Sequence, residues 1–442
     1  MKANIPSKAI EKIDENVGLS PNEILKLRKN VDDFSKKLMP FLKKINNKIE
    51  IFLGGSLAKG TVIRKKEKYD VDLFILFPKS YKDKSEKISD YLEKALKNAK
   101  IKYCELNGSR NYYQVGLNNI ILELVPILKI EKANDAQNIT DISPLHVRYL
   151  LKKIKQNKRL PQEIILAKTF CYAQGVYGAE SYIGGFSGYS IEVLVTYFKS
   201  FKKLVNFFSK IKIKKDEKII IDSEKYYKNK QQILDSLNPS KISSSLILID
   251  PVDKTRNVSA ALGDEKLIKF IDSCKKIIKN KKKDLINFLV IKEKSQDYFI
   301  KKAKSKNANL VVLQIKTTKN KLDVAGAKIN KFFDFLTYSL DRENFKIIES
   351  QRFFNENDLT AILNLIIKNP EKTKIVPGPI INCDKKFIKK FKKKYKMVFI
   401  KNKKYYAKTN NRFKDFNSFF NSFFKENKET INQMCIKEVK LC

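Results

Sequence analysis

The stretch Leu53–Pro78 constrains the fold of this chain more than any other. It opens with the glycine turn Gly54–Ser56 and closes with the apolar run Tyr69–Phe77, a predicted buried strand that carries Asp70 and Asp72. Side chains two residues apart in a strand point to one face, so the two carboxylates lie side by side. They repel each other unless a cation lies between them, and ligation by oxygen alone favours Mg²⁺. Because glycines let a backbone approach a phosphate, the segment predicts a phosphate cradle beside half of a metal site.

A third carboxylate stands in the apolar run Ile120–Pro126, where Glu123 is the single charge. A buried Glu is costly unless it is paired or metal-bound, so we expect Glu123 on a strand next to Asp70 and Asp72. Three acids that hold two Mg²⁺ ions are typical of in-line displacement at phosphorus. The alternative is a buried strand with stray acids, but the spacing of the carboxylate pair favours the metal site. A Gly-Ser turn followed by a strand with Asp-x-Asp resembles the signature of the nucleotidyltransferase superfamily.

The charge balance indicates a polyanionic partner. The 442 residues include 91 Lys plus Arg and 48 Asp plus Glu, a formal net charge of +43. Such an excess favours nucleic acid, although a bias toward lysine throughout the source proteome would have the same effect. No apolar run approaches the roughly 18 residues of a membrane span, and the start lacks the apolar core of a signal peptide. Six cysteines without a CxxC pair, and a single histidine, argue against a zinc site and predict reduced thiols in the cytoplasm.

Periodicity and capping residues predict the main elements. A helix over 20–48 begins with a capping box formed by Ser20 and Glu23, and Pro40 should kink or end it. Further along we expect a helix near 85–97, helices within 144–175 and over 190–205, a surface hairpin over 210–230, and a strand, a turn and a helix that starts at Asn257 within 245–261. From residue 263 onward lysine runs and aromatic residues dominate, which favours a separate RNA-binding half.

Four further motifs follow the acidic strands. They are SPLHVRYLL at Ser143–Leu151, AKTFCYAQGVYGAE at Ala167–Glu180, GGFSGYSIEVLV at Gly184–Val195 and DPVDKTRNVSAAL at Asp250–Leu262. In this order the motifs resemble the archaeal-type (class I) CCA-adding enzymes, which are tRNA nucleotidyltransferases. The resemblance covers residues 49–262 well, and later only VPGPI at Val376–Ile380 resembles the GPP turn of the family's tail.

The resemblance implies an α+β fold in three parts. Residues 1–142 would form a nucleotidyltransferase (polymerase-β-like) catalytic head, and residues 143–262 a helical neck that completes the nucleotide pocket. Residues 263–442 would form an α/β body and tail that bind tRNA. In that last part, eight lysines between Lys385 and Lys396 surround Phe387, Phe391 and Tyr395 at helical spacing. We expect the aromatic rings in the core and the lysines on RNA phosphates or in solvent.

Matched motif by motif, the resemblance also implies a site. Asp70, Asp72 and Glu123 match the catalytic carboxylates that bind two Mg²⁺ ions. The nucleotide-binding positions are Gly55 and Ser56 in the phosphate-gripping turn, Lys59, Ser143 and His146 at the triphosphate, Lys168 and Tyr177 at the triphosphate and sugar, and Arg256 at the base.

Structural alternatives stay open for several of these residues. A lone histidine such as His146 is commonly a satisfied core residue, and a core position is the alternative for Tyr177. Arg256 precedes an expected helix whose free amides suit a phosphate or a base edge. Its alternative is a structural salt bridge with Asp250 or Asp253.

Three positions depart from the family pattern. Glu123 replaces the usual Asp, Lys59 stands where Arg is common and lacks its bidentate fork, and Arg110 aligns with a His-Pro-Tyr segment without an assigned role. The implied activity is template-independent addition of C, C and A to the 3′ end of tRNA from CTP and ATP, often by a homodimer. The nearest alternative is a poly(A) polymerase or an oligoadenylate-synthetase-like nucleotidyltransferase. An inactive RNA-binding scaffold is the alternative from another class, although it would be expected to have lost the acids.

Overall fold

The computed structural model describes residues 18–63, 69–118, 120–212, 217–279, 286–290, 295–319, 321–355 and 358–442. The chain forms two compact units, Met1–Lys292 and Glu293–Cys442. The expected boundary at residue 262 falls inside the first unit, because α10 (Asp264–Lys279) packs against α8 (Phe201–Ser209) and shares its core. Within the part of the chain that the structure describes, no helix has the length and apolar character needed to cross a membrane.

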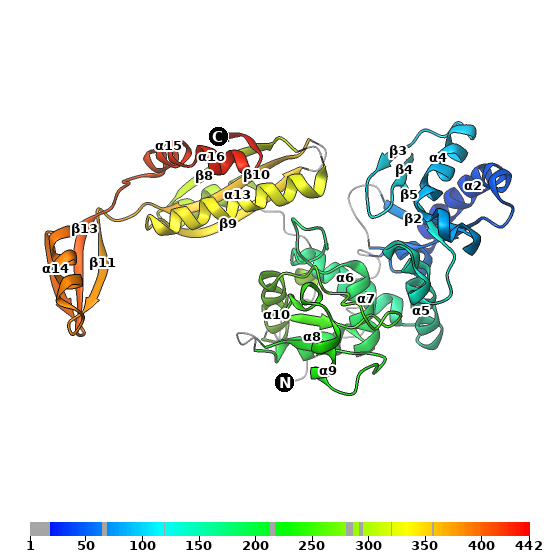
Figure 1. The fold of residues 1–442 in the computed structure, drawn as a ribbon, viewed down its shortest axis with the longest axis horizontal. Coiled ribbons are helices and arrows are strands. Elements are labelled where there is room, and N and C mark those ends of the chain that lie inside the picture. The colour runs from blue at the N-terminus through cyan, green and yellow to red at the C-terminus, as the bar shows by residue number, and fades with distance from the viewer. Residues whose placement is uncertain are drawn as a thin grey trace. The chain divides into compact units, whose positions relative to one another are not determined.

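A mixed five-stranded sheet forms the first layer of the first unit, in the order β1-β2-β5-β4-β3 (Figure 1). Its strands are β1 (Glu50–Leu53), β2 (Tyr69–Phe77), β3 (Cys104–Leu106), β4 (Tyr112–Leu117) and β5 (Ile120–Leu128). The pair β2–β5 is parallel and the other pairs are antiparallel. Alternate residues of β2, from Val71 to Phe77, are buried in a core with α2 (Pro21–Ile45) and α4 (Ile88–Asn98). The opposite face of β2 carries the predicted carboxylates.

The first long helix, α2, confirms the predicted capping box. The Glu23 backbone N–H donates to Ser20 Oγ at 3.3 Å, and the Ser20 N–H donates to Glu23 Oε2 at 2.8 Å. Pro40 was expected to kink or end the helix; it lies inside the helix, so the expected end at this residue is wrong. Leu38 and Leu42 are fully buried on either side of Pro40, and this packing outweighs the backbone hydrogen bond that proline cannot donate.

The rest of the first unit is mostly helical. The short helices η1 (Lys79–Lys87), η2 (Ala133–Asp135) and η3 (Ile139–Ile142) pack beside the sheet. They are joined by α5 (Ser143–Gln156), α9 (Lys230–Ser236) and η4 (Pro239–Ile242), while α6 (Leu160–Ala173), α7 (Gly188–Phe198), α8, α10 and α11 (Ile286–Leu289) surround an aromatic core. The rings of Phe170, Phe208 and Phe270 meet in this core at centroid distances of 5.1 and 5.8 Å. Residues 143–279 therefore bury a helical core of their own beside the sheet.

Two local predictions in this region are wrong. The expected hairpin over 210–230 is absent from its described residues: β6 (Ile219–Ile221) pairs in parallel with β7 (Leu246–Leu248). The expected helix at Asn257 is a turn, since Asn257 Oδ1 accepts from the Ser259 and Leu248 N–H groups, each at 2.9 Å. An Asn side chain that satisfies nearby backbone donors favours a turn over a helix, and the next helix begins at Asp264.

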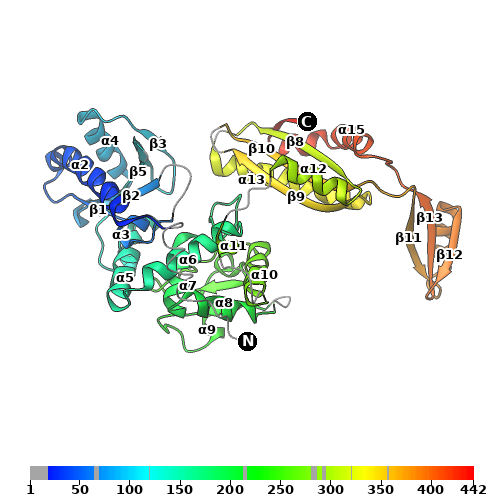
Figure 2. The same cartoon turned by 180° about the vertical axis from the view of Figure 1, so that it is seen from behind.

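The second unit is built on the antiparallel sheet β14-β8-β10-β9. Its strands are β8 (Asn309–Thr317), β9 (Lys346–Asn355), β10 (Thr360–Lys368) and β14 (Ile436–Leu441). One face packs against α13 (Leu322–Arg342), α15 (Phe416–Glu426) and α16 (Lys428–Gln433), and the other against α12 (Gln296–Ser305). Figure 1 shows α13 on the near face of the sheet, and Figure 2, the view from the opposite side, shows α12 on the other face.

A small layer within the second unit contains β11 (Thr373–Ile380), β12 (Met397–Lys401), β13 (Lys404–Asn410) and α14 (Lys385–Lys394). The VPGPI segment lies in β11 with a shift in register, so the expected turn is wrong. Phe391 lies against Gly378, where a Cβ would come within 2.6 Å of its ring. The expectation of core aromatics fails for Phe387, which is 60% exposed because no second layer covers this side of α14 among the described residues.

Candidate active site

The glycine turn and the first acidic strand are in direct contact. The Gly54 N–H donates to the Asp72 carbonyl at 2.8 Å, and the short helix α3 (Gly55–Lys59) follows at once. Gly55 has φ +59°, and a Cβ at this position would overlap Asp72 Oδ2. The Asp72 carboxylate therefore lies in a space that exists because Gly55 has no side chain.

The acids lie as the strand pattern predicts. The parallel register of β2 and β5 pairs Asp72 with Glu123, and directly paired residues of neighbouring strands point to one face. Glu123 Oε1 accepts from Gln114 Nε2 at 2.9 Å. Burial raises the pKa of Asp72 above its ordinary value, Lys59 opposes this shift, and Asp70 adds to it. A cation beside Asp72 would relieve both unfavourable effects.

A cavity of about 270 Å³ joins the acids to residues from the helical region. Asp70 and Asp72 line it together with five of the predicted nucleotide-binding residues, which are Gly55, Ser56, Lys59, Lys168 and Tyr177. Glu123, Ser143, His146 and Arg256 lie outside this lining. Across the described ranges, no three His, Cys, Asp or Glu side chains converge closely enough to enclose an ion in this conformation. The two carboxylates that line the cavity fit Mg²⁺, which commonly takes one or two protein carboxylates.

Glu192 on α7 lines the same cavity, and the sequence interpretation missed it. It is fully buried and accepts from Lys59 Nζ at 2.7 Å, from Lys168 Nζ at 2.8 Å and from Thr61 Oγ1 at 2.9 Å. Burial favours a higher pKa, but Lys168 and then Lys59 outweigh it and hold the pKa of Glu192 at about 2. The sequence does contain a signal for Glu192, because it is the single charge in the apolar run Ile191–Val195. The same pattern singled out Glu123.

A second buried carboxylate, Asp250, holds two of the predicted residues. Its Oδ2 accepts from Arg256 Nη1 at 3.0 Å and lies 2.9 Å from His146 Nε2, while its Oδ1 accepts from the Tyr189 hydroxyl at 3.0 Å. The His146 and Tyr189 rings are 4.1 Å apart between centroids. Both structural alternatives, the satisfied histidine and the Arg256 salt bridge, are therefore present. Tyr189 also lines the cavity, so this cluster borders it.

Ser143, a predicted site residue, and Arg110, which has no assigned role, both lie outside the lining of the cavity. Ser143 is the first residue of α5, one turn before His146. Arg110 is buried and donates to Asp141 Oδ1 at 2.7 Å and to the Pro126 carbonyl at 3.0 Å. Arg110 thus ties the end of β5 to η3 and lies apart from the cavity that holds the acids.

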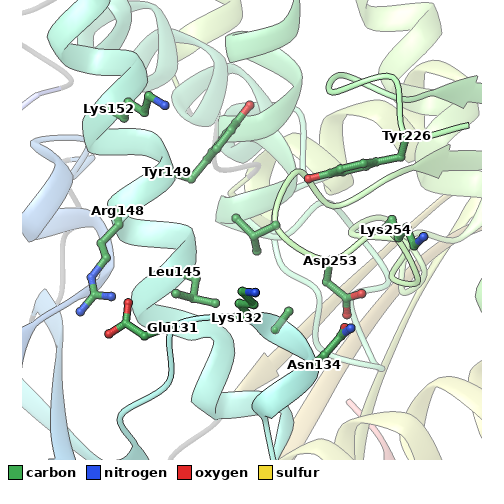
Figure 3. A pocket seen from close by; sticks show the side chains of 12 residues that line it. Glu131, Lys132, Asn134, Leu145, Arg148, Tyr149, Lys152, Tyr226, Asp253 and Lys254 are labelled. Carbon is green, nitrogen blue, oxygen red and sulfur yellow. The ribbon is translucent and has the colours of Figure 1, made fainter.

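A larger cavity of about 510 Å³ lies elsewhere and contains none of the predicted site residues. It is lined by segments 131–134 and 252–254, by one side of α5 and by Tyr226 (Figure 3). The segment 131–134 follows the last residue of β5, whereas the acids lie toward the first residues of β2 and β5. The chemistry of its side chains therefore makes the smaller cavity the candidate active site.

Comparisons with known proteins match both units. The model of the tRNA nucleotidyltransferase second domain matches residues 162–288, and the model of the CCA-adding enzyme C-terminal domain matches residues 309–437. The model of the second messenger oligonucleotide or dinucleotide synthetase domain matches residues 5–143. A crystal structure of the Cid1 poly(U) polymerase superimposes with a TM-score of 0.51 at 13% identity, over 64% of this chain and 98% of that one. At this identity the likeness supports the nucleotidyltransferase fold alone.

Curated relatives cover most of the chain. A CCA-adding enzyme of Saccharolobus islandicus is 29% identical over 81% of this chain and 80% of its own length. A CCA-adding enzyme of Nanoarchaeum equitans is 33% identical over 80% of this chain and 83% of its own length. Identity at this level across both units, together with the two domain matches, shows that the chain belongs to the archaeal-type CCA-adding enzymes.

Proposed function

We propose that this protein adds C, C and A to the 3′ end of tRNA from CTP and ATP, without a template and with release of pyrophosphate. Its membership of the CCA-adding enzymes supports this activity. One observation supports the location of the site: Asp70, Asp72, the glycine turn and the two buried lysines Lys59 and Lys168 line one cavity. Acids, a phosphate cradle and cations are the parts that nucleotidyl transfer requires.

In this proposal Asp70, Asp72 and Glu123 hold two Mg²⁺ ions. When bound, the ions activate the 3′-hydroxyl of the RNA and stabilise the departing pyrophosphate. The register places Glu123 next to Asp72, which supports its part in the ligand set. Because Gln114 donates to one Glu123 oxygen, that side chain is oriented by a neighbouring strand.

The remaining residues bind and orient the nucleotide. The backbone of Gly55 and the Ser56 hydroxyl donate to phosphate oxygens, and Lys59 and Lys168 neutralise the triphosphate. The Tyr177 ring packs on the sugar. All five residues line the cavity beside Asp70 and Asp72, which supports these roles.

We assign the Asp250 cluster to both the triphosphate and the base of the nucleotide. Asp250 orients His146 and Arg256, so that His146, with Ser143, contacts the triphosphate and Arg256 reads the base. The resemblance to the family supports these roles, and the ion pair is compatible with them because Arg256 remains 30% exposed in its side chain. A guanidinium held by one carboxylate oxygen retains donors for a base edge.

The test of the function is the product. The enzyme is incubated with tRNA that lacks its 3′ CCA, together with CTP, ATP and Mg²⁺, and the 3′ ends are sequenced. We expect addition of C, C and A followed by a stop. Long tails made from ATP alone would indicate a poly(A) polymerase instead, and absence of any incorporation would indicate an RNA-binding scaffold.

We assign tRNA binding to the second unit, with α14 as its most basic element. The lysines of α14 are exposed, and Phe387 adds an exposed ring among them. Lysines release counterions from RNA phosphates when they bind, so the affinity should depend steeply on salt. We expect the dissociation constant for tRNA to rise by about 1,000-fold between roughly 50 and 200 mM salt.

Filter binding measures this salt dependence in a triple variant and in a matched control. Changing Lys389, Lys392 and Lys393 to Gln should reduce the slope of log K against log salt by about two or three. The control changes three exposed lysines of α2 to Gln, namely Lys29, Lys36 and Lys37. A control slope that falls as far as that of the α14 variant would contradict the assignment.

The location and the assembly complete the proposal. All six cysteines are free thiols in the structure, which supports a cytoplasmic location. We propose a homodimer, the state that the family resemblance implies, and light scattering should then report twice the 51.4 kDa of one chain.

A further inference from the structure

One buried carboxylate links the sheet and the helical region of the first unit. Glu192 accepts from Lys59 and Thr61, which belong to α3 and the turn after it, and from Lys168 on α6. The relative exposures of Lys59, Lys168 and Glu192 are 9%, 2% and 0%. The contacts of Glu192 with Thr61 and Lys59 join residues that are 131 and 133 positions apart in the chain.

Lys59, Lys168 and Glu192 carry one formal positive charge in excess among themselves, because two ammonium groups share a single carboxylate. All three line the cavity that Asp70 and Asp72 also line. Burial lowers the pKa of Lys168, and the charge of Glu192 is the largest effect that opposes this. Without that carboxylate, two buried cations would repel each other and would move apart or lose a proton.

The hydrogen bonds of Lys168 identify which contact a nucleotide would replace. Its three donors point to Glu192 Oε1 at 2.8 Å, to Thr61 Oγ1 at 3.1 Å and to the Thr61 carbonyl at 3.2 Å. An ammonium has three donors, so a phosphate must take the place of one of these partners. The Thr61 oxygens are neutral acceptors at longer distances, whereas Glu192 is an ionised acceptor, and a bond between two charged groups is stronger, so Thr61 is the partner that is released.

We propose that Glu192 is a positioning residue that holds the Lys59 and Lys168 ammonium groups side by side, facing the triphosphate of the incoming nucleotide. This inference rests on the proposed function, in which both lysines bind the triphosphate. Glu192 keeps both lysines inside the cavity before the nucleotide arrives and remains their anchor afterwards. The carboxylate acts through the lysines, so its effect depends on the number of phosphates in the ligand and is independent of the base.

The test is calorimetric titration of the complete enzyme with CTP and with CMP, in Mg²⁺ and without tRNA. The variant Glu192→Gln keeps the shape of the side chain and removes its charge. We expect it to weaken CTP binding by about tenfold or more and to leave CMP binding within about twofold. In the addition assay, the KM for CTP should rise while the KM for tRNA stays the same.

A matched control separates positioning from stability. Asp141 is also fully buried in the first unit, and it pairs with Arg110 at 2.7 Å outside the cavity. Asp141→Asn and Glu192→Gln should both lower the melting temperature, but Asp141→Asn should leave the ratio of CTP to CMP affinity unchanged. Should Glu192→Gln not fold, Glu192→Asp replaces it, because it keeps the charge on a shorter side chain and should lower the ratio by an intermediate amount.

A double-variant cycle with Lys168→Met completes the experiment. If Glu192 acts through this lysine, Glu192→Gln should reduce CTP affinity much less in the Lys168→Met background than in the wild type. If Glu192→Gln or Glu192→Asp leaves the CTP to CMP ratio unchanged while Lys168→Met lowers it, the positioning role is overturned and the site assignment stands. If Lys59→Met and Lys168→Met both leave the ratio unchanged, the site assignment itself fails, and the inference with it.

Discussion

Changing Asp72 to Asn should reduce nucleotide incorporation by about 1,000-fold or more while tRNA affinity stays within about twofold. Asp72 lies against Gly55, next to Glu123 in register, and lines the cavity with Asp70. An amide is isosteric with the carboxylate, but it lacks the negative charge that a divalent ion requires. The loss is therefore expected in the chemical step, and single-turnover assays with preloaded tRNA and CTP measure it directly.

The same change should leave the fold intact. Burial and the neighbouring Asp70 raise the pKa of Asp72, so the ionised carboxylate is held at a cost to the folded state. Removing its charge should leave the melting temperature unchanged or raise it. Asp83→Asn, on an exposed residue of η1, is the matched control and should retain full activity. An Asp72→Asn variant that still extends tRNA at the normal rate would overturn the assignment of the catalytic acids.

Changing Gly55 to Ala should reduce incorporation by about 100-fold or more, because the new Cβ would displace the Asp72 carboxylate. The position also has φ +59°, where any side chain adds strain of about 1–2 kcal/mol. Strain alone would lower stability without a specific loss of catalysis. Steady-state kinetics with CTP and a tRNA acceptor, together with thermal unfolding, separate the two effects.

Gly60 offers a matched control for that substitution. It has φ +65°, close to that of Gly55, and it ends the same short helix, α3. A Cβ on Gly60 would meet no atom within 4 Å. Gly60→Ala should therefore carry the same backbone strain, about 1–2 kcal/mol, and retain most of the activity. Equal losses of activity in the two variants would mean that backbone strain, and not the Asp72 position, explains the effect.

Local pattern was enough to predict the catalytic strand. The alternation of β2 buries Val71 and Leu73 and leaves Asp70 and Asp72 on the other face, as a period of two residues requires. The capping box at Ser20 was equally predictable, because its partners are three residues apart. The ordered motifs identified the family over residues 49–262, since each motif is a short continuous segment.

Other predictions failed where distant packing outweighed local preference. Pro40 lies within a continuous helix because Leu38 and Leu42 are buried on either side of it. β6 pairs with β7 across more than twenty residues, a partner that the charged sequence around it does not indicate. Phe387 has the spacing of a core residue but lies on a layer that no other element covers among the described residues.

The sequence by itself determined which strands carry the acids, where the glycine turn stands and which family the chain resembles. These properties depend on residues within a few positions of one another. Only the tertiary structure decided that Glu192 pairs with Lys59 and that Asp250 holds His146. Such pairs lie more than a hundred residues apart, and they depend on strand register and on helix packing. A charged residue in an apolar segment predicts that the charge is paired, but only the fold determines which residue is its partner.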